Sequence, residues 1–345
     1  MQAALVTGKE TLELVEMPDP SPSSHHTVVD ISYCGICGTD LHAYLSGEPY
    51  NPSICGHEWV GHVSAEATAN HGYKEGDRVA IGVGTACGTC ASCARGDAAH
   101  CEVVFAGAAG RDEHAAQHGG FASSIAFPTT RLYHVPHHLS DEEASILEPA
   151  TVAVHAVRRT TVNLGDSVLV IGAGPIGLLV AQCAKLSGAG KMIVVEPESG
   201  RRELAASFGA DLILDPGATA FPDQLASATQ AGIDVVFECA GIATTVQQSV
   251  DWVRRGGRVS LVGVANGPET IIPALWLVKE IKLTTSLAYL REDFEIAKGL
   301  AADGSLNLSA LHTSTVPLSE IQGAFAKLAR EPSEVKILVD PRTTG

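Results

Sequence analysis

Four cysteines in the run CGTCASCARGDAAHC have the spacing of a metal site. They are Cys87, Cys90, Cys93 and Cys101. Two residues separate the first from the second and the second from the third, and seven residues separate the third from the fourth. Four thiolates in one short loop predict a closed, tetrahedral Zn²⁺ site of the structural kind. A disulfide pair is the alternative, but nothing else in the chain indicates an oxidising compartment.

A second set of residues has the composition of a catalytic metal site. Cys37, His57 and Glu58 offer a thiolate, an imidazole and a carboxylate, and Glu148 is a fourth candidate. Three such ligands leave one coordination position for water or substrate. Cys34 and Cys37 also form a CxxC, so a redox pair or a rubredoxin-like half-site is an alternative. A thioredoxin-type CxxC would lie next to a βαβ pattern, which is missing there.

A glycine-rich turn stands between an apolar run and a helical pattern, in the segment Gly172-Ala173-Gly174-Pro175-Ile176-Gly177. The glycines permit a tight turn, close approach of a pyrophosphate and close helix–strand packing. Pro175 suits the first helical turn, and the helix N-terminus attracts phosphate. Glu196 follows the next strand, where it would accept hydrogen bonds from ribose hydroxyls. The alternative for Glu196 is a surface acid at a strand end.

The elements that must position these residues change in kind near residue 150. The first part has short β-like runs with Gly, Pro and Asp at the bends, and the second alternates strands and helices, which predicts a parallel sheet covered on both faces. The predicted strands are Thr27–Tyr33, Trp59–Ala65, Arg78–Val83, Ser167–Ile171, Lys191–Glu196, Asp234–Glu238 and Arg258–Val262, and the predicted helices are Pro175–Ser187 and Arg201–Phe208.

Composition is typical of a globular α/β enzyme. The chain has 345 residues, enough for two domains, with 45% hydrophobic residues and 35 glycines. A formal charge of −16 argues against a nucleic-acid or anionic-membrane partner. Met1 is not followed by a signal-peptide pattern, and no apolar run reaches the roughly 20 residues of a membrane span. Nine cysteines then indicate a reducing cytoplasm, with Cys55, Cys183 and Cys239 as packing residues.

These motifs together resemble a known family. The run Cys37-Gly38-Thr39-Asp40-Leu41-His42, then Gly56-His57-Glu58, the four-cysteine lobe and the glycine turn come in the order seen in zinc-dependent medium-chain dehydrogenases/reductases of the alcohol dehydrogenase superfamily. The segments Leu147-Glu148-Pro149, Val195-Glu196-Pro197 and Ser286-Leu287-Ala288-Tyr289 resemble the polyol branch, which includes sorbitol and (R,R)-butanediol dehydrogenases.

The resemblance implies a fold and a reaction. It implies a GroES-like, mostly β catalytic domain over residues 1–149, a Rossmann NAD-binding domain over residues 150–290, and a segment 291–345 that returns to the catalytic domain. It further implies a homodimer or homotetramer with two Zn²⁺ per chain, which transfers hydride between NAD and a secondary alcohol, vicinal diol or polyol and its ketone.

The resemblance also implies roles near the catalytic zinc. A zinc ion with an open position would act as a Lewis acid on an alcohol oxygen. Thr39 would take the proton from that oxygen, His42 would pass it on, and Asp40 would orient His57. One of Glu58 and Glu148 would bind zinc directly and the other through water, with Glu58 favoured.

Cofactor and substrate residues follow from the same likeness. Arg201 would lie against the adenine, and Tyr289 and Glu148 would border the substrate. Glu196 would repel a 2′-phosphate and favour NAD, although Arg201 and Arg202 could offset that repulsion. The nicotinamide would be held by two segments, Val262-Gly263-Val264 and Ser286-Leu287-Ala288. The alternative is that these are ordinary buried strand and turn residues.

Two departures from the sorbitol dehydrogenase pattern leave the substrate open. Ala43 and Ala288 stand where those enzymes carry a tyrosine and an arginine, so recognition of a long polyol should be weaker. A threonine-type or simple secondary-alcohol dehydrogenase is therefore an alternative. A zinc-free or non-catalytic relative is disfavoured by the full ligand set, and a zinc-ribbon interaction module by the acidic charge.

Overall fold

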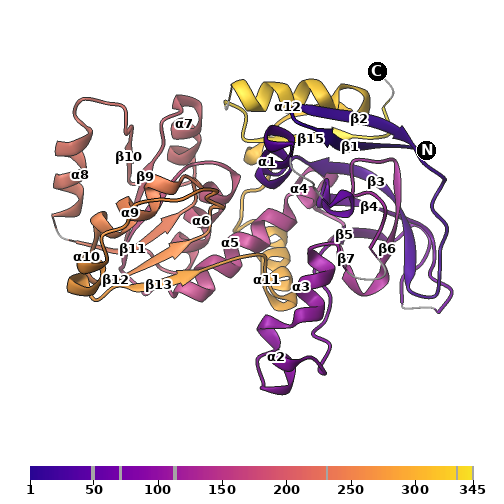
Figure 1. The fold of residues 1–345 in the computed structure, drawn as a ribbon, viewed down its shortest axis with the longest axis horizontal. Helices are drawn as coiled ribbons and strands as arrows, with labels where there is room; N and C mark the ends of the chain where they lie inside the picture. The colour runs from indigo at the N-terminus through magenta and orange to yellow at the C-terminus, as the bar shows by residue number, and fades with distance from the viewer. Residues whose placement is uncertain (48–50, 70–71, 112–114, 231, 332, 344–345) are drawn as a thin grey trace. The chain divides into compact units, whose positions relative to one another are not determined.

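A computed structural model describes residues 1–47, 51–69, 72–111, 115–230, 232–331 and 333–343 of the chain (Figure 1). The chain forms two compact units. Unit 1 contains Met1–Glu148, Leu290–Ala302 and Leu311–Gly345, and unit 2 contains Pro149–Tyr289 and Asp303–Ala310. Residues 303–310 thus group with unit 2 and not with the returning segment. The Gln182 side chain accepts from Asn307 N at 2.9 Å and donates to Asn307 O at 3.3 Å, which fastens this segment to α6 of unit 2.

Unit 1 is built on a seven-stranded mixed sheet in the order β14-β15-β3-β4-β5-β7, with β6 also paired to β3, and on the two-stranded sheet β1-β2. The late strand β15 pairs antiparallel with β3, with Leu338 opposite Gly35. The strands are β1 (Gln2–Gly8), β2 (Thr11–Glu16), β3 (His26–Gly35), β4 (Glu58–Ala65), β5 (Arg78–Ile81), β6 (Ser124–Pro128), β7 (Leu132–His134), β14 (His312–Pro317) and β15 (Lys336–Asp340).

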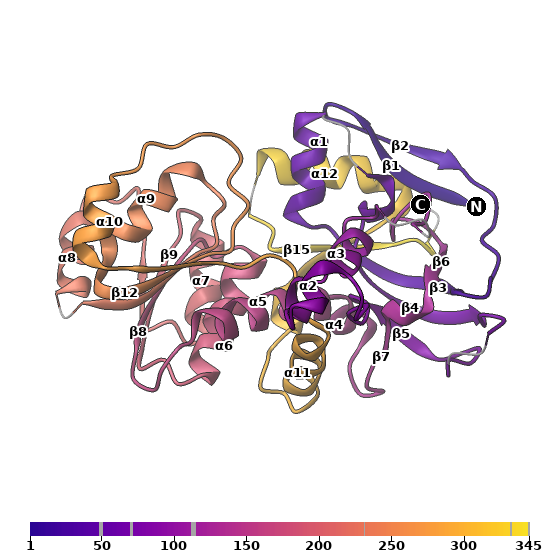
Figure 2. The same ribbon diagram turned by 60° about the horizontal axis from the view of Figure 1, so that its bottom comes forward.

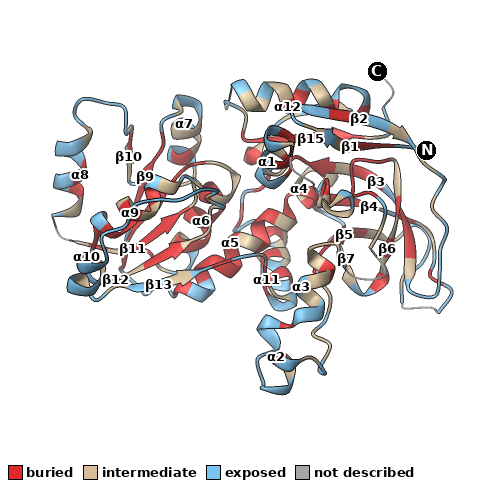
Figure 3. Cartoon of the chain, in the orientation of Figure 1, coloured by how far each residue is buried: buried red, intermediate tan, exposed pale blue. Residues whose placement is uncertain are grey.

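The helices of unit 1 flank this sheet and form a lobe. An aromatic core that includes Trp59, Phe121 and Phe325 holds the sheet and α12 together. The lobe that carries the four cysteines is largely exposed around α2 (Figure 3). The helices are α1 (Gly38–Ser46), α2 (Ala91–Ala94), α3 (Glu102–Ala108), α4 (Asp141–Ser145), α11 (Arg291–Ala302) and α12 (Ile321–Arg330), while α5 (Leu147–Thr160) spans the boundary between the units.

Unit 2 contains a parallel six-stranded sheet in the order β10-β9-β8-β11-β12-β13. The chain crosses from β10 back to β11, so the sheet is doubly wound, and Figure 2 shows α6 on one face with α9 and α10 on the other. Its elements are β8 (Ser167–Ile171), α6 (Pro175–Leu186), β9 (Lys191–Val195), α7 (Ser199–Ser207), β10 (Leu212–Leu214), α8 (Phe221–Thr229), β11 (Ile233–Glu238), α9 (Ala243–Trp252), β12 (Val253–Leu261), α10 (Pro273–Lys279) and β13 (Lys282–Thr285).

The predicted α/β class is confirmed: a mostly β unit is combined with a doubly wound parallel sheet of the Rossmann type. Strand β8 has the predicted limits, and the other predicted strands and both predicted helices differ from the prediction by one or more residues at an end. Strand β12 already begins at Val253, which pairs with Ile233 ahead of a register irregularity, and β5 ends at Ile81. Among the described residues, no helix is both long and apolar enough to cross a membrane.

Candidate metal and cofactor sites

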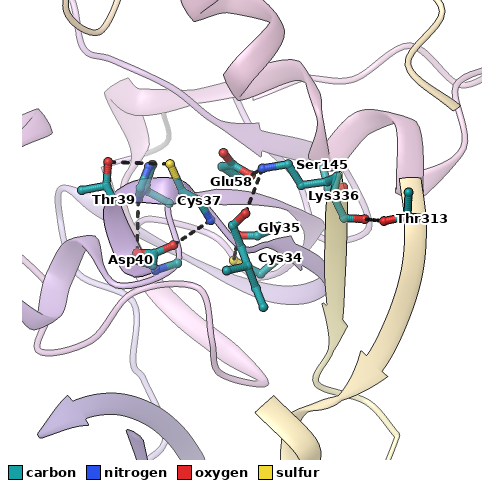
Figure 4. A network of polar contacts seen from close by, with 12 residues as sticks. Cys34, Gly35, Cys37, Thr39, Asp40, Glu58, Ser145, Thr313 and Lys336 are labelled. Atoms are coloured by element: carbon teal, nitrogen blue, oxygen red, sulfur yellow. Dashed lines mark hydrogen bonds and ion pairs between the residues drawn. The ribbon is translucent and has the colours of Figure 1, made fainter. Parts of the chain in front are cut away.

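Cys37 lies where β3 gives way to α1. It is the N-cap of this helix, and its backbone N–H donates to Asp40 Oδ2 at 3.1 Å, in a capping box (Figure 4). Asp40 is fully buried, and its Oδ1 accepts from Gly56 N at 3.2 Å. The two hydrogen bonds of Asp40 thus fix the segment that carries Cys37 against the segment that carries Gly56.

His57 has a defined orientation. Its Nδ1 lies 2.9 Å from the Ile54 carbonyl oxygen and 3.7 Å from Asp40 Oδ1. Because a carbonyl oxygen only accepts, Nδ1 carries a proton, and Nε2 is the nitrogen left to bind a metal. The nearer partner is thus a backbone carbonyl, at the end of the short turn Pro52–Ile54, and the orienting role of Asp40 stays a prediction. Burial would lower the pKa of His57, but negative Cys37 and then Asp40 raise that pKa well above its usual value.

Glu58 begins β4 and is 1% exposed. Its Oε2 accepts from Lys336 Nζ at 2.5 Å, in an ion pair whose two side chains are both 2% exposed (Figure 4). A Cβ on Gly35 would lie 2.4 Å from the same oxygen, so only glycine leaves room for the carboxylate there. Lys336 was not among the predicted site residues, and the only signal for it was a lysine at the start of the apolar run KILVD.

The ligand atoms of Cys37, His57 and Glu58 all lie within 4.8 Å of one another. The ligands of a tetrahedral zinc ion lie about 3.3 to 3.8 Å apart, so this donor set fits zinc after a small contraction. Glu148 is outside the set. It is close enough for its charge to raise the pKa of His57, after the larger effects of burial, Cys37 and Asp40.

Two more predicted residues stand on α1 beside this set. Thr39 Oγ1 lies 3.7 Å from Cys37 Sγ, and Thr39 is exposed. His42 is also exposed and follows three positions later, so the two side chains lie on the same side of the helix. A hydroxyl and an imidazole are therefore accessible next to the proposed metal ligands.

The sulfur atoms of the four-cysteine lobe converge in the same way, with all four within 4.8 Å of one another. Cys87 Sγ accepts from Cys90 N at 3.3 Å and from Thr89 N at 3.4 Å, and Cys90 Sγ and Cys101 Sγ lie 3.9 Å apart. Hydrogen bonds from the Thr89 hydroxyl and then from backbone N–H groups lower the pKa of Cys87 to about 6. All nine cysteines of the chain are free thiols, which suits a metal site better than a disulfide.

The glycine turn has the shape that a pyrophosphate requires. Gly172 has φ = +92°, and a Cβ on Gly177 would lie only 1.8 Å from Gly172 O. A Cβ on Gly174 would have no neighbour nearer than the Arg201 guanidinium at 3.8 Å. The turn is therefore open at its middle glycine, and Arg201 lies beside that opening. The contact of Arg201 with the adenine stays a prediction.

Glu196 is buried and ties β9 to the glycine turn. Its Oε2 accepts from Ala173 N at 2.6 Å, and its Oε1 accepts from Glu198 N at 2.9 Å. A carboxylate has about four acceptor positions, so two remain for ribose hydroxyls. Arg202 is already engaged: it donates to Glu196 O at 2.9 Å and pairs with Asp215 at 3.2 Å.

The segments predicted to hold the nicotinamide follow β12 and β13. The N–H groups of Val262 and Gly263 donate to Glu238 O at 2.9 and 2.8 Å, while Val264 and Leu287 are exposed. Ser286 is buried, and its Oγ has no hydrogen-bond partner among the described residues, as expected of a hydroxyl that serves a ligand. The backbone of Ala288 is in the left-handed region, with φ = +55°. Tyr289, which follows it, is buried.

Comparison with known proteins gives matches to both parts of the chain. Residues 23–137 match the family described as alcohol dehydrogenase GroES-like domain, and residues 175–303 match the family described as zinc-binding dehydrogenase. The chain is 31% identical to 2-dehydro-3-deoxy-L-galactonate 5-dehydrogenase of Pseudoalteromonas atlantica, over 99% of this chain and 98% of that protein. It is 30% identical to sorbitol dehydrogenase of Bacillus subtilis, over 99% and 97%.

Solved structures agree with these matches. 2R,3R-butanediol dehydrogenase of Bacillus subtilis superposes with a TM-score of 0.84 at 28% identity, over 99% of both chains. A zinc-binding dehydrogenase of Sinorhizobium meliloti, solved with NADP bound, superposes with a TM-score of 0.85 at 28% identity, also over 99% of both chains.

Proposed function

Since the chain belongs to the zinc-dependent medium-chain dehydrogenase/reductase family, in its polyol branch, we propose that it is a two-zinc, NAD-dependent dehydrogenase. It would interconvert a secondary alcohol, vicinal diol or polyol and the corresponding ketone. The observation that carries the proposal is the convergence of Cys37, His57 and Glu58 beside the exposed hydroxyl of Thr39. Zinc held by these three residues would supply a Lewis acid for the substrate oxygen.

The residues on α1 would then manage the proton. Thr39 would accept the proton of the substrate hydroxyl and give its own to His42, which is exposed and can exchange it with water. Asp40 would act on structure, because its two oxygens bind the backbone at Cys37 and Gly56 and so hold the two ligand-bearing segments together. Glu148 would lie farther from the metal than Glu58 and act through water.

The cofactor would be bound by unit 2, and NAD is the better fit. Glu196 would present its remaining lone pairs to ribose hydroxyls and oppose a 2′-phosphate. Arg202 pairs with Asp215, which reduces its ability to neutralise that phosphate. The NADP-bound relative makes a direct comparison of the two cofactors necessary.

The substrate is proposed to be a compact diol or secondary alcohol. Ala43 is buried and Ala288 is half-buried, and neither has a polar group for a distant hydroxyl. A long polyol would leave such hydroxyls without partners, which costs affinity. Tyr289 and Glu148 would recognise the part of the substrate next to the reacting carbon.

We also propose that the protein is a homodimer or homotetramer of a reducing cytoplasm. Strand β13 is the edge of the parallel sheet, and α10 beside β12 exposes Leu277 (78%) and Val278 (68%). An exposed sheet edge with apolar neighbours is a common place for subunits to pair. Nine free thiols are stable in a reducing compartment.

The test is a substrate panel with metal analysis. Purified protein should reduce NAD⁺ with vicinal diols or secondary alcohols faster than with hexitols or threonine, and should contain two zinc ions per chain. NADP⁺ should give a much lower kcat/KM. Protein that contains one zinc ion or fewer and is fully active would contradict the two-site proposal.

A further inference from the structure

Lys336 is a buried lysine beside the proposed zinc ligands. It begins β15, is 1% exposed and is among the largest fully buried side chains of the described chain. Lysine is almost never fully buried unless its charge is paired. Its place in the core therefore calls for a reason.

The backbone brings this lysine to the metal ligands from far along the sequence. Strand β15 pairs with the end of β3, and Ile36 N donates to Ile337 O at 3.0 Å. This pairing places Lys336 Nζ 2.5 Å from Glu58 Oε2 (Figure 4). The same nitrogen lies 2.9 Å from Ile36 O. Two of its three N–H groups thus have fixed acceptors, one of which is a proposed metal ligand.

The groups that face the ammonium are negative. Burial would lower the pKa of Lys336, but Glu58 on β4, Cys37 before α1 and Glu148 at the start of α5 together raise that pKa. The geometry is that of an ammonium, because Nζ donates both to the Glu58 carboxylate and to the Ile36 carbonyl oxygen. The remaining ionisable ligand, His57, belongs to the same cluster.

We propose that Lys336 is a positioning residue that holds Glu58 by one oxygen and keeps the zinc site one unit of charge more positive than its protein ligands would leave it. The proposal rests on the zinc site of the proposed function. A thiolate from Cys37 and a carboxylate from Glu58 cancel the two charges of Zn²⁺, and the ammonium restores one. A more positive site lowers the pH at which the substrate hydroxyl gives up its proton.

Lys336 has a second effect when the metal is absent. Without it, Glu58 would be a buried carboxylate with no opposite charge, which is strongly destabilising. The ion pair therefore keeps Glu58 in place before metal binds. The cost is competition, because the ammonium and the zinc ion attract the same carboxylate.

The test compares three variants of the holoenzyme by charge. K336M removes the ammonium, E58Q removes the carboxylate, and E58Q/K336M removes both. The probe is Co²⁺ exchanged into the Cys37 site. The absorption of bound Co²⁺ reports its ligands, and competition with a chelator reports its affinity. C37S provides the background, because it retains only the four-cysteine site. K336M should hold Co²⁺ about tenfold or more tightly than the unmodified protein, and the midpoint of its kcat/KM–pH profile should rise by about one unit.

Further variants separate the charge from the packing of the side chain. K336R keeps a positive charge and should leave the pH midpoint near that of the unmodified protein. E58Q/K336M should hold Co²⁺ more tightly than E58Q, since the two differ only in the ammonium. This comparison is valid even if K336M does not fold, because replacement of both members of a buried ion pair is better tolerated than removal of one.

Two outcomes would overturn the inference. Weaker Co²⁺ binding by K336M with an unshifted pH profile would show that Lys336 only fills space. Equal Co²⁺ affinity of E58Q and E58Q/K336M would show that its charge does not reach the metal. An unmodified protein that binds no more metal than C37S would instead refute the proposed function, and this inference with it.

Discussion

Replacement of Gly35 by alanine should disturb the proposed zinc site without changing any ligand. The new Cβ would lie 2.4 Å from Glu58 Oε2, whereas real Cβ atoms essentially never come within 3.0 Å of a neighbour. The carboxylate oxygen must therefore move by at least 0.6 Å, the difference between these two distances. It cannot do so freely, because Lys336 Nζ holds the same oxygen and Lys336 Cδ would lie 3.2 Å from the new atom.

The size of the effect follows from the cost of overpacking. Extra methyl groups in a packed core cost about 1 to 3 kcal/mol. If this strain acts on the ligand geometry, affinity for the catalytic metal falls about 5- to 150-fold at about 1.4 kcal/mol per tenfold. Zinc content after dialysis against a chelator, kcat/KM and thermal unfolding should all be measured, and G35A should lose one of its two zinc ions first.

Gly38 provides a matched control three residues later. It is the first residue of α1, and a Cβ there would meet nothing within 4 Å. G38A should keep its zinc and activity and be slightly more stable, because alanine is a better helix former than glycine by about 0.5 to 1 kcal/mol. If G35A retained zinc and activity as well as G38A does, Glu58 would not occupy the position described here.

Four other changes have clear expected outcomes. C93S should lower the thermal unfolding temperature and remove one zinc ion per chain, with less effect on the kcat of enzyme that remains folded, and an unchanged melting curve would argue against a structural metal. H57A should abolish turnover while circular dichroism stays native, so activity near that of the unmodified protein would exclude His57 as a ligand. E196S should narrow the ratio of kcat/KM for NAD⁺ to that for NADP⁺, and equal values in the unmodified enzyme would show that Glu196 does not face the ribose. Burial would raise the pKa of Asp234, but hydrogen bonds from the Ser167 N–H and from Arg254 outweigh burial and lower that pKa. The stability that Asp234 contributes is therefore full above its unfolded pKa of about 4 and is lost as pH falls through the lower folded value. D234N should therefore unfold at a lower denaturant concentration than the unmodified protein at about pH 7 but not near pH 2.

Much of the site could be read from spacing because its residues lie in short local motifs. Cys37 starts a helix that also carries Thr39 and His42, so a few residues of sequence determine their arrangement. The glycine turn is equally local, since Gly172 and Gly177 pack against each other. Strand β8 was predicted with its full limits because both faces of a central parallel strand are apolar.

The residues that were missed depend on tertiary pairing. Lys336 lies 278 positions after Glu58 in the sequence, and only the β15–β3 register brings them together. The Ile54 carbonyl that orients His57 could not be predicted, because any residue has a carbonyl and only the turn geometry directs this one. Glu238, whose Oε1 accepts from Ala240 N, Gly241 N and Thr245 Oγ1, was predicted only as the end of a strand.

The position of β15 has a consequence for how the protein is made. Unit 2 is encoded almost entirely by one continuous stretch, so it can fold while the chain is still being synthesised. Unit 1 cannot complete its sheet until the ribosome has released residues 336–340, and until then Cys37, His57 and Glu58 lack the strand that fixes Glu58. The metal ligands are thus synthesised well before the strand that completes their site. We expect zinc acquisition to follow the emergence of β15 from the ribosome, and premature termination before Lys336 to yield a folded unit 2 attached to an unfinished unit 1.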